Sequence, residues 1–255
     1  MLGARFRRVI LNRPNLRIPF PKEFAARLRG KTVTAVSRRG KYLIVELTSG
    51  ESLVMHLGMS GWFYVARIGD RSRQADPHDH AIFLMSSGQS VLFNDPRRFG
   101  FMDLAQRGQL EEYPALKKMG PEPLSKAFDG VPLARGCCGK RVSLKVVLLD
   151  QRTVAGLGNI YASEALHHAR LSPLRKASSI ATSSGAPKPG AITLAKSIKA
   201  VLTAAIKRRE TPYRSARFRV YEREDEPCLR RGCGGTITRI WQAGRSTFYC
   251  PICQR

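Results

Sequence analysis

The stretch "CLRRGCGGTITRIWQAGRSTFYCPIC", residues 228–253, contains four of the six cysteines of the chain. They form two close pairs, C-x4-C and C-x2-C, with sixteen residues between the pairs. Each pair lies in a turn with glycine or proline, so the four thiolates can meet in a tetrahedron around zinc. The alternative, two disulfides, is typical of secreted chains, whereas this composition is typical of an intracellular one. The spacing therefore predicts one structural zinc ion, bound by Cys228, Cys233, Cys250 and Cys253.

The charge of the chain indicates its partner. Among 255 residues, 44 Lys and Arg stand against 19 Asp and Glu, which gives a formal net charge of +25. A basic surface can serve solubility alone, but an excess of this size repels itself unless a polyanion compensates it, which favours nucleic acid. No apolar run approaches the roughly 18 residues that a membrane span requires, so we expect no membrane partner.

The hydrophobic pattern changes along the chain. Residues 4 to about 106 alternate β-branched and polar side chains between Ser-Gly turns, which predicts a sandwich or barrel of antiparallel strands. Apolar residues spaced by three and four then predict helices in 141–151, 159–171 and 191–209. The Ser- and Pro-rich stretch 176–191 is expected to be a flexible surface loop. The class is α+β.

Three short motifs bear on function, and two of them allow two interpretations. In "NDPRRFG" (94–100) Phe99 either packs inward from a solvated turn or wedges between stacked bases beside Arg97. In "HLGMSG" (56–61) Met59 would by default be a core residue. In "DQRTVAGLGNIYASEAL" (150–166) Asn159 opens a helix after a Gly-x-Gly turn, which is either a phosphate cradle or a plain interhelical turn.

These motifs, with "RRGKYLIVEL", "PHDH" and the final "GRSTFYCPICQR", resemble in order the bacterial formamidopyrimidine-DNA glycosylases of the Fpg/Nei family. The resemblance covers nearly the whole chain. It implies a two-domain clamp on DNA: an antiparallel β-sandwich (1–110), a helix-two-turn-helix domain (111–222) and a zinc-finger β-hairpin (223–255).

The same resemblance implies a function. Family members excise oxidised purines, such as 8-oxoguanine and formamidopyrimidines, from duplex DNA and then cleave at the abasic site. The expected partner is double-stranded damaged DNA, and the expected protein is a monomer of the bacterial cytoplasm, associated with the nucleoid.

Site residues follow from the matching motif positions. The resemblance implies that Met59, Arg97 and Phe99 fill the void left by the extruded nucleotide. It implies DNA binding by His78, Arg97 and Lys140, and contacts to the phosphates that flank the lesion by Lys145 and Asn159. Lys41 matches the lysine that transfers a proton in β-elimination. Arg245 matches an arginine that holds phosphate at the lesion and acts in δ-elimination.

The chain departs from the family pattern in three places. The family begins with a proline nucleophile and a glutamate, in a segment like "PELPEVET", which this sequence does not contain. We therefore expect the reading frame upstream of Met1 to encode such a segment. The loop in 206–228, which covers the extruded base in the family, is shorter here, and the first zinc pair has four intervening residues instead of two. Cys137 and Cys138 are expected to be structural thiols outside the metal site.

Three hypotheses remain at this point. The first is a glycosylase with abasic-site lyase activity whose true start lies upstream. The second is a catalytically silent protein that binds damaged or abasic DNA. The third, a zinc-ribbon RNA-binding or transcription-associated protein, is disfavoured because such a protein does not need "HLGMSG" or "NDPRRFG". Retention of Lys41 and Arg245 favours the first over the second, since a binding protein has less use for elimination residues.

Overall fold

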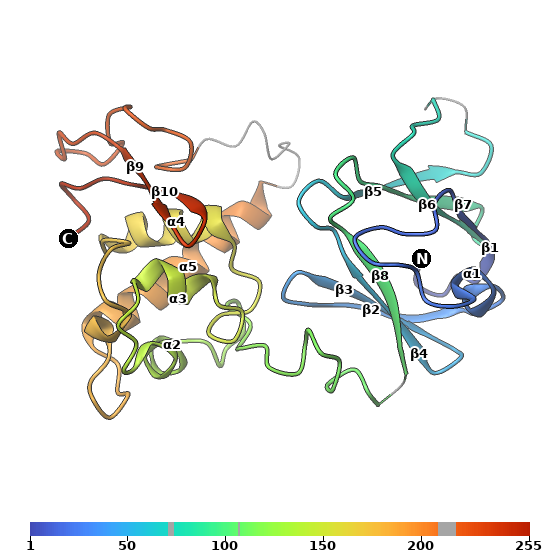
Figure 1. Ribbon diagram of the computed structural model, residues 1–255, viewed down its shortest axis with the longest axis horizontal. Coiled ribbons are helices and arrows are strands. Elements are labelled where there is room, and N and C mark those ends of the chain that lie inside the picture. The colour runs from blue at the N-terminus through green and yellow to red at the C-terminus, as the bar shows by residue number, and fades with distance from the viewer. Residues whose placement is uncertain (71–73, 107, 209–217) are drawn as a thin grey trace. The chain divides into compact units, whose positions relative to one another are not determined.

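The computed structural model describes residues 1–70, 74–106, 108–208 and 218–255. The chain forms two compact units, Met1–Lys117 and Lys118–Arg255 (Figure 1). Each unit has its own hydrophobic core and is described by itself. The three-part division drawn from the sequence, with boundaries after residues 110 and 222, stays a prediction.

The first unit consists of two four-stranded antiparallel sheets and a short helix. One sheet has the strand order β1-β6-β7-β5 and the other has the order β2-β3-β4-β8. The elements are β1 (Phe6–Leu11), α1 (Phe24–Leu28), β2 (Val33–Arg39), β3 (Tyr42–Leu47), β4 (Glu51–His56), β5 (Trp62–Arg67), β6 (Asp79–Met85), β7 (Gln89–Asn94) and β8 (Phe101–Gln106).

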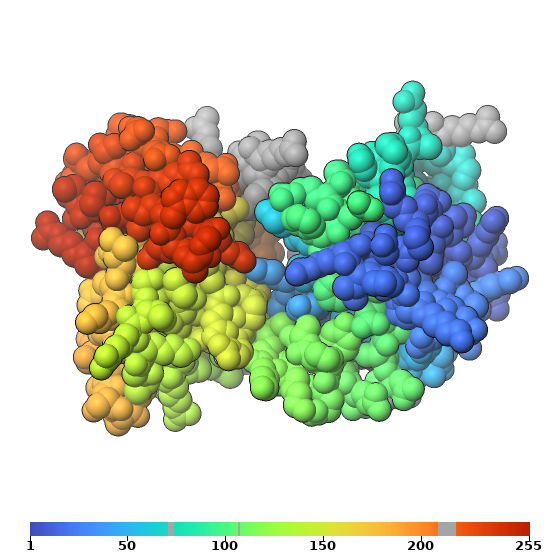
Figure 2. Space-filling model, viewed as in Figure 1, coloured from blue at the N-terminus to red at the C-terminus, as the bar shows by residue number. Residues whose placement is uncertain are grey.

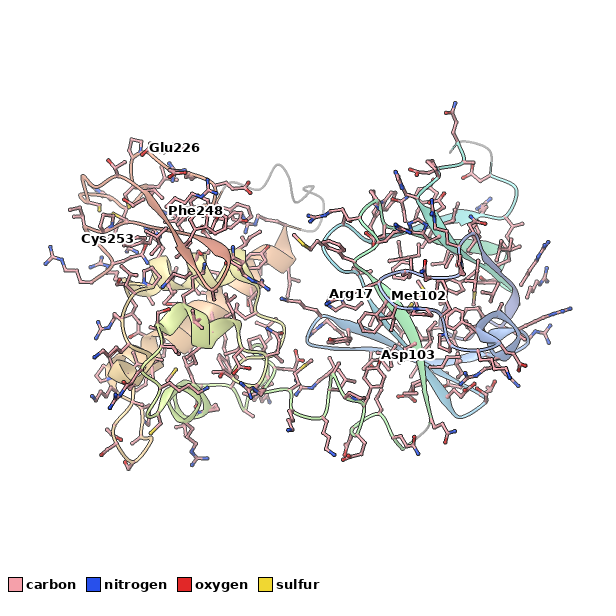
Figure 3. All side chains as sticks on the ribbon, in the orientation of Figure 1. Arg17, Met102, Asp103, Glu226, Phe248 and Cys253 are labelled. Atoms are coloured by element: carbon pink, nitrogen blue, oxygen red, sulfur yellow. The ribbon has the colours of Figure 1, made fainter. Side chains whose placement is uncertain are left out.

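Alternating side chains hold these two sheets together. In β6 the side chains of Ala81, Phe83 and Met85 are fully buried, and the residues between them are only half-buried. Phe83 meets Phe6 of β1 edge to face, with ring centroids 5.6 Å apart. Met102 of the other sheet belongs to the same buried cluster (Figure 3). The predicted antiparallel sandwich is therefore confirmed.

The second unit is helical and ends in a β-hairpin. Its elements are α2 (Gly130–Cys137), α3 (Leu144–Leu149), α4 (Asn159–Ala169), the 3-10 helix η1 (Ala177–Ile180), α5 (Pro189–Lys207), β9 (Thr238–Gln242) and β10 (Arg245–Tyr249). Helix α4 packs against both α5 and β10. Its Leu166 side chain is fully buried in one cluster with Leu194 and Ile198 of α5, so α4 lies between the other helices and the hairpin.

The stretch 176–191 differs from the expected flexible loop. Ala177 and Ile180 of η1 are buried in the helical core, and Lys188 donates its backbone N–H to the carbonyl of Ile180. The Ser- and Pro-rich composition gave the wrong prediction because two apolar side chains, three residues apart, are enough to fix a short turn against a core.

The C-terminal hairpin has a tight turn and a very small core. Ala243 and Gly244, at the turn, both have positive φ, at 48° and 71°, the conformation that joins two twisted strands with two residues. Among the described residues, the buried cluster of the finger consists of Val220, Ile237, Phe248 and Cys250, of which Figure 3 labels Phe248. The finger atoms, red in Figure 2, lie directly on the yellow atoms of the helical part. Such a small cluster buries little apolar area, so a bound metal contributes much of its folding free energy.

Helix α5 is long and apolar enough to cross a membrane by length and composition, and no other helix among the described residues is. This is weak support for a membrane span, because core helices of water-soluble proteins meet the same criterion. One face of α5, which includes Leu194, Ala195 and Ile198, is buried against the other helices. The absence of a membrane partner stays a prediction.

Candidate nucleic-acid interface and metal centre

The four cysteines of the finger come together as predicted. The sulfur atoms, one per cysteine, all lie within 4.8 Å of one another. Cys228 and Cys253 are 3.9 Å apart, and Cys233 and Cys250 are 3.5 Å apart. A Cβ atom at Gly235 would lie 2.7 Å from the Cys250 sulfur, so only glycine allows this approach of the first turn to the second.

The chemistry of these donors fits zinc. Four sulfur ligands at one point form the closed tetrahedral set of a structural zinc site. Burial raises the pKa of the Cys253 thiol to about 12. Because zinc binds cysteines as thiolates, metal binding releases the thiol protons. Bound zinc would hold the two turns of the finger together.

The other two cysteines stay outside this cluster. Cys137 ends α2 and is fully buried, and its burial raises the pKa of its thiol to about 11. Cys138 donates to the backbone carbonyls of Thr182 and Ser183. Both are structural thiols, as the sequence predicted.

Glu164 connects α4 to the segment that enters the finger. Its carboxylate accepts hydrogen bonds from three consecutive backbone N–H groups, those of Arg219, Val220 and Tyr221, at 2.9 to 3.1 Å. Glu164 is nearly fully buried. A carboxylate that accepts several backbone N–H groups is satisfied without a cation, so this contact fixes the base of the finger.

Lys145, Asn159 and Arg245 meet at the hairpin. The Lys145 ammonium donates to the Ser246 carbonyl at 3.0 Å and to the Thr247 hydroxyl at 2.5 Å. The Asn159 amide donates to the same Ser246 carbonyl at 3.0 Å. Arg245, the neighbour of Ser246, is exposed. Helices α3 and α4 therefore hold β10 in place, and the Arg245 side chain extends from this fixed strand.

Lys145 has an unusual environment. Its side chain is fully buried, and burial lowers its pKa to about 8, with a smaller contribution from the positive charge of Arg245. Two of the three ammonium donors are used within the protein. The predicted contact to a phosphate therefore stays a prediction, and a direct contact would have to use the third donor.

Hydrogen bonds of the Gln151 side chain hold the Gly-x-Gly stretch before α4 in place. The Gln151 side-chain amide donates to the carbonyls of Leu149 and Leu157, and its oxygen accepts the N–H of Gly156. Gly156 has φ of 72°, which favours glycine. Lys140 lies 4.0 Å from Asp150, at the beginning of this loop. One glutamine therefore fixes the loop that presents the N-terminus of α4.

In the first unit, Met59, Arg97 and Phe99 lie on two neighbouring loops. Met59 is 72% exposed and Phe99 is 42% exposed. The Arg97 guanidinium lies 4.6 Å from the centroid of the Phe99 ring, a cation–π distance. These exposures exclude the interpretation of Met59 and Phe99 as core residues.

A buried carboxylate and a glycine hold the two loops together. Asp95 is fully buried and accepts the hydroxyl of Ser60 and the backbone N–H of Gly100. The Ser60 oxygen in turn accepts the N–H of Arg97. A Cβ atom at Gly58 would lie 2.4 Å from the carbonyl carbon of Phe99, so the two backbones touch. The exposed side chains are thus carried by a rigid support.

The remaining two predicted residues of this unit are near that support. The carbonyl of half-buried His78 accepts the N–H of Asp95. Lys41 is exposed at the turn between β2 and β3, where its charge helps to lower the pKa of His56, although burial of His56 is the larger cause. His56 Nδ1 also accepts the N–H of Gly58, the neighbour of Met59. Through His56, the charge of Lys41 therefore acts close to the loop that carries Met59.

Three family models match consecutive parts of the chain. The formamidopyrimidine-DNA glycosylase N-terminal domain matches residues 1–102, the H2TH domain of the same enzymes matches 119–216, and the zinc finger found in Fpg and IleRS matches 225–255. The chain belongs to the formamidopyrimidine-DNA glycosylase family.

Curated family members and solved structures agree. A formamidopyrimidine-DNA glycosylase of Rhodopseudomonas palustris (strain BisA53) is 50% identical over 276 residues, which covers all of this chain and 94% of that protein. One of Bradyrhizobium sp. is 48% identical with the same coverage. The Lactococcus lactis enzyme, non-covalently bound to DNA with an AP site, has a TM-score of 0.86 at 31% identity and covers 100% of this chain and 94% of that one. The same enzyme with FAPY-dG-containing DNA gives a TM-score of 0.86 at 30% identity, again with 100% and 94% coverage.

Family membership confirms the α+β class, the β-sandwich, the helix-two-turn-helix fold and the zinc-finger hairpin. It also confirms one metal site at the four cysteines. The shortened loop that the sequence indicated in 206–228 lies partly outside the described residues, which exclude 209–217.

Sequence reasoning missed the residues that support the site. Glu164, Asp95, Gln151 and His56 make no recognisable motif of their own. The only signal for Glu164 was an acidic residue on a helix with apolar spacing, and for Asp95 an acidic residue between a strand and an arginine-rich turn.

The metal assignment can be tested by elemental analysis. The wild-type chain should contain one zinc ion, and Cys250→Ser should lose it because a hydroxyl is a poor substitute for a thiolate in this ligand set. Cys138→Ser is the matched control and should retain one zinc. A Cys250→Ser protein that keeps a full zinc ion would contradict the assignment.

Proposed function

We propose that this protein is a base-excision-repair enzyme that removes oxidised purines from duplex DNA and cleaves the strand at the resulting abasic site. Membership of the formamidopyrimidine-DNA glycosylase family supports this function, and so do the relatives solved with damaged DNA. The observation that carries it is the exposed group of Met59, Arg97 and Phe99 on two rigidly joined loops.

An enzyme that acts on a base must first take it out of the stack. Extrusion costs a few kcal/mol of lost stacking and pairing, and inserted side chains offset part of this cost. Phe99 offers an aromatic face for the neighbouring bases, and Met59 offers a flexible apolar side chain. Arg97 adds a cation that is held beside the Phe99 ring. Together they have the size and polarity to replace a missing nucleotide.

The second unit offers a phosphate site. Arg245 is exposed on a strand that Lys145 and Asn159 hold through the Ser246 carbonyl. A guanidinium in a fixed position can bind a phosphate with two parallel hydrogen bonds. We assign Arg245 to the phosphate at the lesion, with Lys145 and Asn159 at the flanking phosphates. His78 and Lys140 are assigned to further contacts with the DNA.

Lys41 and Arg245 are assigned to the chemical steps after base removal. Lys41 is exposed next to the turn between β2 and β3 and is therefore able to transfer a proton during β-elimination. Arg245, already placed at phosphate, is assigned to the δ-elimination that follows. We further propose that the protein works as a monomer in the bacterial cytoplasm, at the nucleoid.

The function is tested with a duplex that contains one 8-oxoguanine. Protein expressed from its native reading frame should release the free oxidised base and cut that strand, and it should leave the undamaged duplex intact. Binding to the damaged duplex without any base release would contradict the enzymatic proposal and support the catalytically silent binding protein instead.

The void-filling role is tested by the preference for an abasic site over intact duplex. Phe99→Ala should reduce the ratio of the two affinities by about 5- to 150-fold, because stacking on an aromatic ring is worth roughly 1–3 kcal/mol per base. Affinity for intact DNA should change little. Val65→Ala, which removes an apolar side chain that is 54% exposed on β5, is the matched control. An unchanged ratio in Phe99→Ala would refute the role.

The charge of Lys145 should make DNA binding depend on pH. Its pKa of about 8 lies below the usual lysine value, so the ammonium deprotonates between about pH 7 and pH 9. Over this range binding to damaged and intact duplexes should weaken, and the slope of log affinity against log salt should fall by up to about one. Lys145→Met should remove this pH dependence, and Lys140→Met should retain it.

The stability of the fold should respond in the opposite direction. Because the pKa of Lys145 falls from its usual 10.5 to about 8 in the folded protein, its charged form costs stability at neutral pH, and this cost decreases as the pH rises from about 8 to 10.5.

The binding prediction has its own contradicting outcome. If the DNA affinity of the wild-type chain depends on pH in the same way as that of Lys145→Met, the assignment of Lys145 to a phosphate is wrong.

A further inference from the structure

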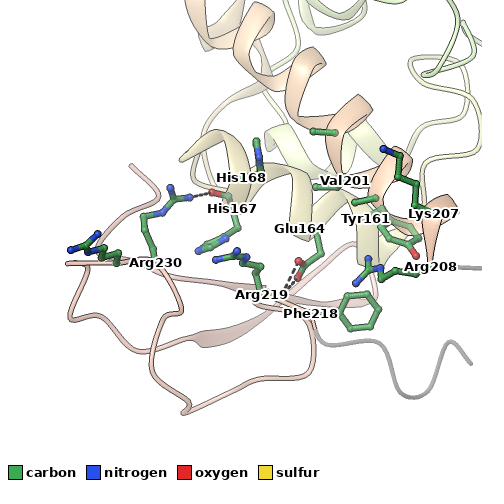
Figure 4. A pocket seen from close by; sticks show the side chains of 13 residues that line it. Tyr161, Glu164, His167, His168, Val201, Lys207, Arg208, Phe218, Arg219 and Arg230 are labelled. Atoms are coloured by element: carbon green, nitrogen blue, oxygen red, sulfur yellow. Dashed lines mark hydrogen bonds between the residues drawn. The ribbon is translucent and has the colours of Figure 1, made fainter. Parts of the chain in front are cut away.

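The negative charge of the predicted zinc site must be compensated by groups other than the four cysteines. Zinc bound by four thiolates carries an excess of negative charge, and the finger has almost no core in which to bury it. Hydrogen-bond donors around the sulfurs must therefore compensate this charge. Among the described residues, His167 of α4 places a ring nitrogen beside a cysteine sulfur, and Arg230 of the finger donates to the His167 backbone carbonyl (Figure 4).

The first is His167, in the last turn of α4. Its imidazole is 2% exposed, and Nε2 lies 3.4 Å from the Cys228 sulfur. An Nε2–H tautomer would donate to the thiolate. His167 belongs to the helical part of the unit and is separated from Cys228 by 61 positions in the sequence, so this contact joins a helix to the metal site.

The second is Arg230, which lies between the first two cysteines. One of its terminal nitrogens donates to the backbone carbonyl of His167 at 2.5 Å. Arg230 also lines one pocket together with Cys233 and Cys253. Its Nε is buried without a partner of its own. A guanidinium with an unsatisfied buried donor beside four sulfurs fits an anionic cluster.

The carbonyl that Arg230 contacts is one of the last of α4. The terminal carbonyls of a helix have no partner within it, and a positive charge at this end is favoured by the helix dipole. The His167 carbonyl also accepts the N–H of Arg170, the residue that ends the helix in a left-handed conformation. Arg230 thus reaches from the metal site to the C-terminal end of α4.

We propose that His167 and Arg230 are the outer hydrogen-bonding partners of the four-thiolate site, which couples metal binding by the finger to capping of α4. The contact of Arg230 with the end of α4 gives a physical reason for the long spacing of the first cysteine pair. The four residues between Cys228 and Cys233 include Arg230, and this longer turn carries the guanidinium back to the helix.

The coupling has a consequence for the rest of the unit. Helix α4 also carries Glu164, which holds the segment 219–221, and Asn159, which holds β10. Loss of the metal would leave Arg230 and His167 without the thiolates and would loosen the end of this helix. His167 and Arg230 are positioning residues, because they act through the cysteines and the helix and not on DNA.

The first experiment measures the rate at which zinc passes to a chelating dye. His167→Leu should release zinc about 10-fold faster or more, because loss of such an outer partner typically lowers metal affinity 10- to 100-fold. His167→Gln should restore slow release, since its amide nitrogen can replace Nε2–H. His168→Leu is the matched control, as His168 contacts Ser197 of α5 instead. Equal rates in wild type and His167→Leu would overturn the proposal.

The second experiment separates Arg230 from its neighbour. Arg230→Leu should release zinc faster and should lower the hydrogen-exchange protection of the last turn of α4 while zinc is still bound. Arg231→Leu removes the same charge from the same turn and should do neither. If a Leu variant fails to fold, the His167→Gln and Arg231→Leu variants still test the proposal. Fast zinc release by His167→Gln would refute it. It would also be refuted if Arg231→Leu accelerated zinc release as much as Arg230→Leu.

Discussion

The arrangement of the second unit depends on the hydrogen bonds that the Glu164 carboxylate accepts. It accepts three consecutive backbone N–H groups from residues 219–221, where the chain begins the finger. A buried carboxylate would be costly by itself, but satisfied donors remove most of that cost. Because Glu164 is in the middle of α4, the finger takes its position from this helix. Asn159 at one end and His167 at the other extend the same support.

The first unit uses the same solution on a smaller scale. Buried Asp95 accepts a hydroxyl and a backbone N–H from the two loops that carry Met59 and Phe99. In a chain with so few acidic residues relative to basic ones, these two are used inside the protein and satisfied by neutral donors. The basic side chains on the surface thus keep their charge for a polyanion. Rigid loops also matter energetically, since an inserted side chain that is already ordered loses less entropy when it enters DNA.

Burial of Lys145 shows how the phosphate site is built. An ammonium is costly to bury, and this cost is expressed in its lowered pKa. The two hydrogen bonds to β10 compensate part of it and fix the strand that carries Arg245. The small finger gains rigidity in the same way, from contacts with α3 and α4 and from its metal. Its own hydrophobic cluster is too small to provide this.

The sequence by itself determined the repeating patterns and the spacings. Alternation predicted the strands of the sandwich, three- and four-residue spacing predicted α4 and α5, and the positions of Cys228 to Cys253 predicted the metal site, because each depends on residues close in sequence. Tertiary structure alone decided which side chains hold these elements together. The contact of His167 with Cys228 spans 61 positions and that of Lys145 with Thr247 spans 102. Polar residues at such separations have no periodicity, so only the folded chain shows that Glu164, Asp95 and Arg230 meet their partners.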